Sequence, residues 1–161
     1  MQLDKGKDED RQEKTSTVIL GPLTEDLPFM IRNLNAMLRP VGAAIREPLD
    51  LEAGSIGVLF LVWVNPGVSQ NDLAENLAMK KSAITKLVKE LETQGHLERS
   101  RHQGDRRVNS LTLTAKGHRL VASIREISVP LNKTLTAHLS KDEHDLFVRV
   151  LSKLHIRLSG Q

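Results

Sequence analysis

Two short amphipathic segments, separated by two residues, constrain the fold of this chain more than any other feature. The first begins with Ser69-Gln70-Asn71-Asp72, which has the Ser-x-x-acid form of a helix capping box. The second covers residues 80–94, and its apolar residues follow the i, i+3, i+4, i+7 spacing of a helix: Ile84, Leu87, Val88 and Leu91. The sequence therefore predicts two short helices joined by a tight turn, the second of which ends at Gly95.

A hairpin pattern follows these two helices. Residues 96–101 and 108–114 contain residues that are compatible with strands, and Gln103-Gly104-Asp105 between them supplies turn chemistry. Two short helices followed by a small hairpin form a winged helix-turn-helix, in which the second helix can enter the major groove of DNA. The predicted fold class is mostly α (α+β), with the hairpin as a wing.

Helical periodicity also continues on both sides of this module. Residues 24–45 are typical of a long amphipathic helix that Pro40 should kink or divide, and the apolar segment 51–64 suits a buried central helix. Helical spacing returns at Ala115, with an interruption or bend near Pro130, and Ser140–Glu143 forms a second capping box. We expect a disordered tail at 1–16, an N-terminal helical region at 17–50, a winged helix-turn-helix lobe at 51–114 and C-terminal helices at 115–161.

Composition and charge exclude several classes of protein. The longest apolar run, residues 56–64, is far shorter than the roughly 20 residues of a membrane span. The first residues carry acids where a signal peptide needs an apolar core, which predicts a cytoplasmic protein without a membrane partner. The absence of cysteine excludes disulfides, thiolate zinc sites and a cysteine redox switch.

Positive charge is concentrated in one part of the chain. The net charge is only +3, but residues 80–107 hold eight lysines and arginines against four acidic residues. The face of the second helix opposite its apolar residues carries donors and cations that suit phosphates and base edges: Ser82, Thr85, Lys86 and Lys89. Such a face taken alone is equally consistent with an ordinary solvated surface. Arg106 and Arg107 at the hairpin tip favour DNA, because adjacent guanidinium groups can follow phosphates or enter a narrow minor groove.

The run LAENLAMKKSAITKLVKELETQGHLERSRHQGDRRVNSLTLTAKG closely resembles the DNA-binding helices and wing of the multiple-antibiotic-resistance repressor (MarR) family of winged-helix transcription regulators. The similarity continues over residues 24–158. By resemblance, Ser82, Thr85, Lys86 and Lys89 belong to the recognition helix, and Arg107 is the wing arginine that enters the minor groove, supported by Asp105 and beside Arg106. Three positions depart from the usual pattern of the family: Lys80 in place of a capping serine, Ala78 in place of a turn glycine, and Pro40 within the first helix.

The resemblance also implies a homodimer, in which the first and last helices interlock as dimerisation helices. The apolar stripes of the terminal segments agree with this, since a long helix must bury its stripe against something. A symmetric dimer would read a pseudo-palindrome with half-sites about 10 bp apart.

These observations predict a sequence-specific regulator that binds double-stranded DNA, most often a repressor in this family. We expect phosphate contacts from Lys81, Lys86, Lys89 and Arg101, and groove contacts from Ser82, Thr85, Lys86 and Arg107. The alternative is a winged-helix module that binds a protein partner and no specific DNA. The sequence contains none of the common catalytic or nucleotide-binding motifs, so we predict neither an enzyme nor a cofactor.

Small ligands are a separate question. Many family members bind aromatic or anionic effectors between the dimerisation helices and the DNA-binding lobe, which makes Phe29, Phe60 and Trp63 a candidate effector pocket. Ordinary core filling is the commoner role of such aromatics. We predict no metal site, because no two histidines lie three or four residues apart: His96, His102, His118, His138, His144 and His155.

Overall fold

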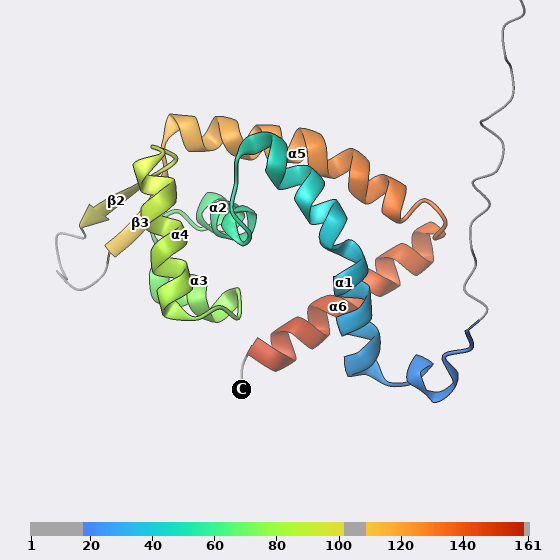
Figure 1. The fold of residues 1–161 in the computed structure, drawn as a ribbon. Helices are drawn as coiled ribbons and strands as arrows, with labels where there is room; N and C mark the ends of the chain where they lie inside the picture. The colour runs from blue at the N-terminus through green and yellow to red at the C-terminus, as the bar shows by residue number, and fades with distance from the viewer. Residues whose placement is uncertain (1–17, 102–108, 160–161) are drawn as a thin grey trace, which may run out of the picture. The chain divides into compact units, whose positions relative to one another are not determined.

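The computed structural model describes residues 18–101 and 109–159, and only the backbone of Ser100, Arg101 and Asn109. Its helices are α1 (Leu27–Arg46), α2 (Ser55–Val64), α3 (Gln70–Asn76), α4 (Lys81–Thr93), α5 (Ala115–Leu135) and α6 (Lys141–Ser159), and its strands are β1 (Val68–Ser69), β2 (Leu97–Arg101) and β3 (Asn109–Leu113) (Figure 1). Short 3-10 turns cover Gly21–Thr24 and Glu47–Leu49. The predicted fold class, mostly helical with a small winged sheet, is confirmed.

The chain divides into two compact units, of which the first ends at Arg39 and the second begins at Pro40. Helix α1 nevertheless continues through Pro40, and α5 continues through Pro130. A division of the helix at Pro40 and an interruption at Pro130 are therefore not observed, whereas a kink at Pro40 or a bend at Pro130 stays a prediction. Proline removes one backbone donor from a helix, and the remaining hydrogen bonds of a 20- or 21-residue helix can hold it together.

The core of the second unit joins its helices to its sheet. The largest fully buried side chains come from α2, α3, α4, β3 and α5, and include Leu59, Leu73, Ile84, Leu91, Leu111 and Ile124. Helix α2 is shorter than the predicted 51–64, because Gly54 precedes it with a left-handed φ of 94°. Leu51 is buried all the same. A Cβ on Gly57 would lie 2.8 Å from Leu77 Cδ2, so this glycine lets α2 approach the residue that ends α3.

Both predicted capping boxes are present. At the start of α3 the Asp72 amide donates to Ser69 Oγ over 3.2 Å, and the Ser69 amide donates to Asp72 Oδ2 over 3.3 Å. At the start of α6 the Glu143 amide donates to Ser140 Oγ, and the Ser140 amide donates to Glu143 Oε2. The Ser140 amide and the Ser140 hydroxyl, which both donate to Glu143 Oε2, hold the pKa of the Glu143 carboxyl below its usual value. Each helix thus begins where the sequence predicted.

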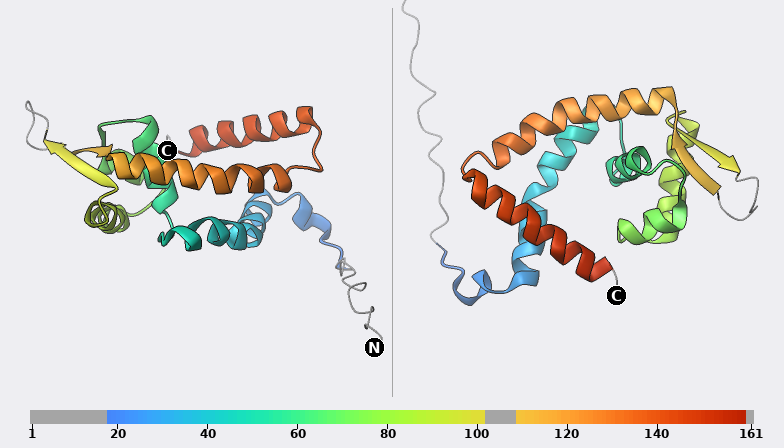
Figure 2. Two further views of the ribbon diagram at one scale, coloured as in Figure 1. Left: turned by 90° about the horizontal axis from the view of Figure 1, so that it is seen from above. Right: turned by 180° about the vertical axis from the view of Figure 1, so that it is seen from behind.

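The wing is part of a three-stranded antiparallel sheet in the order β1-β3-β2. Leu97 pairs with Leu113 at the base of the predicted hairpin, and Val68 of β1 pairs with Leu111 on the other edge of β3. Figure 2 shows the paired strands β2 and β3 at the edge of this unit, next to α4. Strand β1 was not predicted, because two residues are too few to show an alternating pattern.

A tight junction attaches the wing to α4 and α5. The chain turns at Gly95, which has a φ of 75°, and the Thr114 hydroxyl donates to the Gly95 carbonyl over 2.6 Å while accepting from the Gly117 amide. Gly117 packs directly on the His96 carbonyl, and a Cβ at this position would overlap that oxygen. Leu113, Thr114 and Gly117 therefore form the joint between sheet and helix.

Many apolar side chains of the terminal helices are exposed. On α1 they include Leu27, Ile31, Leu34 and Met37, and on α6 they include Leu146, Leu151, Ile156 and Leu158. No helix in the described ranges is both long enough and apolar enough to cross a membrane. These helices therefore carry apolar faces without the length of hydrophobic sequence that a bilayer requires.

Candidate nucleic-acid interface

Helix α4 turns one face into the core and presents the other to solvent. Ile84, Leu87, Val88 and Leu91 are buried, as the spacing predicted. The side chains predicted to contact DNA are all exposed on this helix: Lys81, Ser82, Thr85, Lys86 and Lys89. Lys80 is the N-cap and provides no side-chain hydrogen bond to the helix. We call the exposed side of α4 the basic face; it is defined by Lys81, Ser82, Thr85, Lys86 and Lys89.

The cations of the basic face are not equivalent. Lys86 Nζ lies 2.8 and 2.9 Å from the two carboxylate oxygens of Glu52, which lies between Leu49 and the start of α2. The hydrogen bond from Lys86 lowers the pKa of the Glu52 carboxyl, and the carboxylate raises the pKa of the Lys86 ammonium. Within residues 18–101 and 109–159, no ion pair involves Lys81 or Lys89. Lys86 thus lies on the predicted face, but its ammonium group is already paired with the Glu52 carboxylate. The sequence did not predict this ion pair.

Thr85 connects the two helices of the helix-turn-helix. Its hydroxyl lies 2.9 Å from the Lys81 carbonyl and 3.3 Å from Gln70 Oε1, at the start of α3. One hydroxyl hydrogen can serve only one of these acceptors at a time, and the oxygen stays able to accept a bond from a ligand. Among the described residues, Gln70 Nε2 is buried without a hydrogen-bond partner. Gln70 was not singled out from the sequence, because glutamine at a helix start carries no motif.

The wing is connected to α4 by an ion pair. Arg99 Nε on β2 donates to Glu92 Oε1 over 2.6 Å, and both side chains are about a quarter to a third exposed (31% and 25%). Arg99 is therefore neutralised locally, although it counted toward the basic segment in the sequence. The backbone of Arg101 ends β2, and its side chain is not described. Asp105, Arg106 and Arg107 lie outside the described residues, so their predicted roles stay predictions.

His96 lies at the junction between α4 and β2. Burial lowers the pKa of its imidazole, and the nearby Lys116 ammonium lowers it further. Lys116 in turn donates to the Gln94 carbonyl over 2.8 Å. The ring is therefore neutral near pH 7, so His96 adds no positive charge to the DNA-binding lobe.

The aromatic residues of the predicted effector pocket belong to two units. Phe60 and Trp63 of α2 pack edge to face with ring centres 6.0 Å apart, and the Arg125 guanidinium of α5 lies 5.3 Å from the centre of the Trp63 ring. Phe29 belongs to the first unit, where Arg32 lies over its ring at 5.7 Å. A pocket formed by all three stays a prediction.

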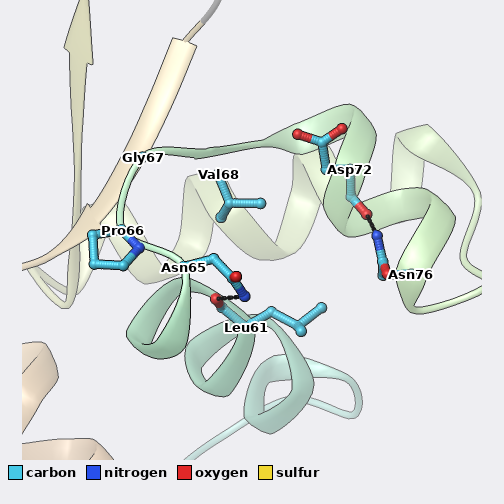
Figure 3. Close-up of a pocket in the computed structure, with 7 residues that line it drawn as sticks. All are labelled: Leu61, Asn65, Pro66, Gly67, Val68, Asp72 and Asn76. Atoms are coloured by element: carbon cyan, nitrogen blue, oxygen red, sulfur yellow. Dashed lines mark hydrogen bonds between the residues drawn. The ribbon is translucent and has the colours of Figure 1, made fainter.

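The second unit contains a pocket whose lining residues include none of these aromatic residues (Figure 3). It is lined by residues from the end of α2 to α3: Leu61, Asn65, Pro66, Gly67, Val68, Asp72 and Asn76. Asn65 Nδ2 donates to the Leu61 carbonyl, and Asn76 Nδ2 donates to the Asp72 carbonyl. Both amide groups are thus engaged with backbone at the ends of their own helices, which is a structural role.

Comparison with known proteins places this lobe in a family. Residues 51–108, from the segment before α2 to the wing, match the model of the MarR family. This lobe is a MarR-family domain. The resemblance noted from the helix-turn-helix and the wing is thereby confirmed.

Individual proteins are similar over most of the chain. A protein of Thauera aromatica, named as a transcriptional regulatory protein for the hcr operon, is 28% identical over 86% of this chain and 84% of its own length. The repressor CouR, solved bound to a 23-mer DNA duplex, has a TM-score of 0.76 at 26% identity and covers 86% of this chain and 99% of its own. Rv2887 of Mycobacterium tuberculosis, solved with salicylic acid, has a TM-score of 0.65 at 26% identity over 80% and 95% of the two chains.

Proposed function

We propose that this protein is a MarR-family transcriptional regulator that binds double-stranded DNA, with α4 in the major groove and the wing beside it. The basic face carries this proposal, because it exposes hydroxyls and ammonium groups on the helix whose other side anchors the core. Support comes from CouR, whose similar fold was solved on a duplex. A role in transcription favours the cytoplasm as the location of the protein. Repression is the activity named for CouR and Rv2887, and we propose the same activity here.

Roles are assigned to the residues by their chemistry. Lys81, Lys86 and Lys89 contact phosphates, with Arg101 as a fourth cation on the wing. Ser82 and Thr85 reach base edges or phosphates, and Lys86 can also donate to guanine. Arg107 enters the minor groove, with Asp105 and Arg106 beside it.

The test is a titration of a labelled 23-mer duplex, the length bound by CouR, at several salt concentrations. Up to four phosphate contacts in each protomer, eight in a dimer, predict a slope as steep as about −7.2 for log affinity against log salt, and therefore a loss of up to about 20,000-fold between roughly 50 and 200 mM. Absent binding, or binding that ignores salt, contradicts the proposal and favours the protein-interaction module.

A second experiment adds salicylate to the titration, since Rv2887 was solved with salicylic acid. If salicylate is an effector, it should weaken duplex binding. Unchanged affinity contradicts this effector class.

The regulator is proposed to act as a homodimer through its terminal helices. In one copy of the chain, both helices expose apolar side chains. Met37 on α1 is 66% exposed and Ile156 on α6 is 72% exposed. A second copy of the chain would cover these faces with surface of the same kind. Sedimentation equilibrium should give about 36 kDa, twice the 18.0 kDa of one chain. A mass of one chain at micromolar concentration would contradict the dimer.

A further inference from the structure

The ion pair between Glu52 and Lys86 lies in the middle of the basic face. Both carboxylate oxygens are within 2.9 Å of Lys86 Nζ, so the carboxylate faces the ammonium group with both oxygens. The two residues are 34 positions apart and belong to different elements, the segment before α2 and the helix α4. Both side chains are exposed, at 68% for Lys86 and 42% for Glu52, so water and ions reach the pair.

A carboxylate and a phosphate offer an ammonium group the same kind of acceptor, an anion with two oxygens. We propose that Glu52 is an internal competitor of DNA phosphate for Lys86, and that it thereby lowers the affinity of the basic face for duplex DNA. This inference rests on the proposed function. It assigns a role in DNA binding to a residue that lies outside both the recognition helix and the wing.

The surroundings of the pair support competition. Exposed ion pairs of this kind contribute little to stability, so the pair can open when a phosphate arrives. Glu90 on α4 adds a second negative charge close to both partners. Within the described part of the chain, Lys81 and Lys89 have no such partner and are free to meet the duplex. Glu52 therefore reduces the contribution of Lys86 selectively.

The decisive variant is Glu52→Gln, which keeps the shape of the side chain and removes its charge. We expect each protomer to contribute about three- to eightfold tighter binding of the labelled 23-mer duplex near 0.1 M salt, because Lys86 no longer shares its phosphate contact with Glu52. The slope of log affinity against log salt should become steeper by up to about 0.9 for each protomer, because Lys86 then makes its phosphate contact in full. Unchanged affinity and slope in a variant that unfolds at the wild-type temperature would overturn the inference.

Two controls separate competition from a general charge effect. Glu75→Gln removes an exposed charge from α3 that is not paired with Lys86, and it should increase affinity less than Glu52→Gln does. In a Lys86→Ala background, Glu52→Gln should raise affinity no more than Glu75→Gln does and should leave the slope almost unchanged. An equal gain from Glu75→Gln, or a full gain without Lys86, would overturn the inference.

The remaining outcomes distinguish this inference from the proposed function. Weaker binding by Glu52→Gln would mean that Glu52 holds Lys86 in a productive position, which overturns competition and leaves DNA binding intact. If the wild-type protein and all variants show no salt-dependent duplex binding, the proposed function fails and the inference fails with it.

Discussion

Replacing Gly117 by alanine should destabilise the protein by about 3 kcal/mol, the upper part of the usual range for overpacking a close-packed site. The added Cβ would overlap the carbonyl oxygen of His96, which is backbone and cannot rotate away as a side chain can. Relief would require the start of α5 to separate from the turn at Gly95, and this would stretch the hydrogen bond from Thr114 to the Gly95 carbonyl. The helix propensity of alanine offsets only about 1 kcal/mol of this loss.

Urea denaturation of the two proteins measures this difference directly. The matched control is Gly42→Ala on α1, where no heavy atom lies within 4 Å of the added Cβ. This change should be neutral or should stabilise the protein by up to about 1 kcal/mol, because alanine favours the helix. Equal stability of the two variants would show that Gly117 does not pack tightly against the His96 carbonyl.

The second large effect is expected from Lys81→Ala combined with Lys89→Ala. These lysines are exposed on α4 and, in the described part of the chain, have no acidic partner. Loss of two phosphate contacts should lower duplex affinity about 60-fold near 0.1 M salt and make the salt slope less negative by about 1.8 for each bound protomer. Stability should hardly change, since neither side chain is part of the core.

The charge-matched control is Lys141→Ala combined with Lys153→Ala, two exposed lysines of α6. It removes the same net charge away from α4 and should reduce affinity only a few-fold through the general field of the protein. An equal loss in both double variants would show that binding follows net charge and that the basic face has no special role.

The sequence predicted those features that repeat at a fixed spacing. The buried positions of α4, from Ile84 to Leu91, follow directly from helical periodicity, and the exposed basic face is its complement. Ser69 and Asp72 reveal the start of α3, because a capping box is a local pattern of four residues. The helices and the hairpin of the winged helix-turn-helix could be inferred from such local signals and from the family resemblance, whereas strand β1 could not.

Features that join distant segments could not be predicted in the same way. Periodicity gives the face on which Lys86 lies, but not the carboxylate 34 residues away that it meets. The pairing of β1 with β3, the ion pair of Arg99 with Glu92 and the contact of Gly117 with His96 also depend on tertiary packing. The positive charges of this region are therefore not equivalent. Lys86 of the basic face and Arg99 of β2 are already paired with carboxylates.

Selection from a random pool of duplexes by the purified protein, near physiological salt, tests the central claim most directly. The enriched sequences are then titrated against non-specific competitor DNA. A homodimeric regulator predicts an enriched inverted repeat with half-site centres about 10 bp apart, bound at least about 1,000-fold more tightly than competitor. A pool that yields no enriched sequence, together with weak binding that is insensitive to salt, would contradict the assignment of this protein as a DNA-binding regulator.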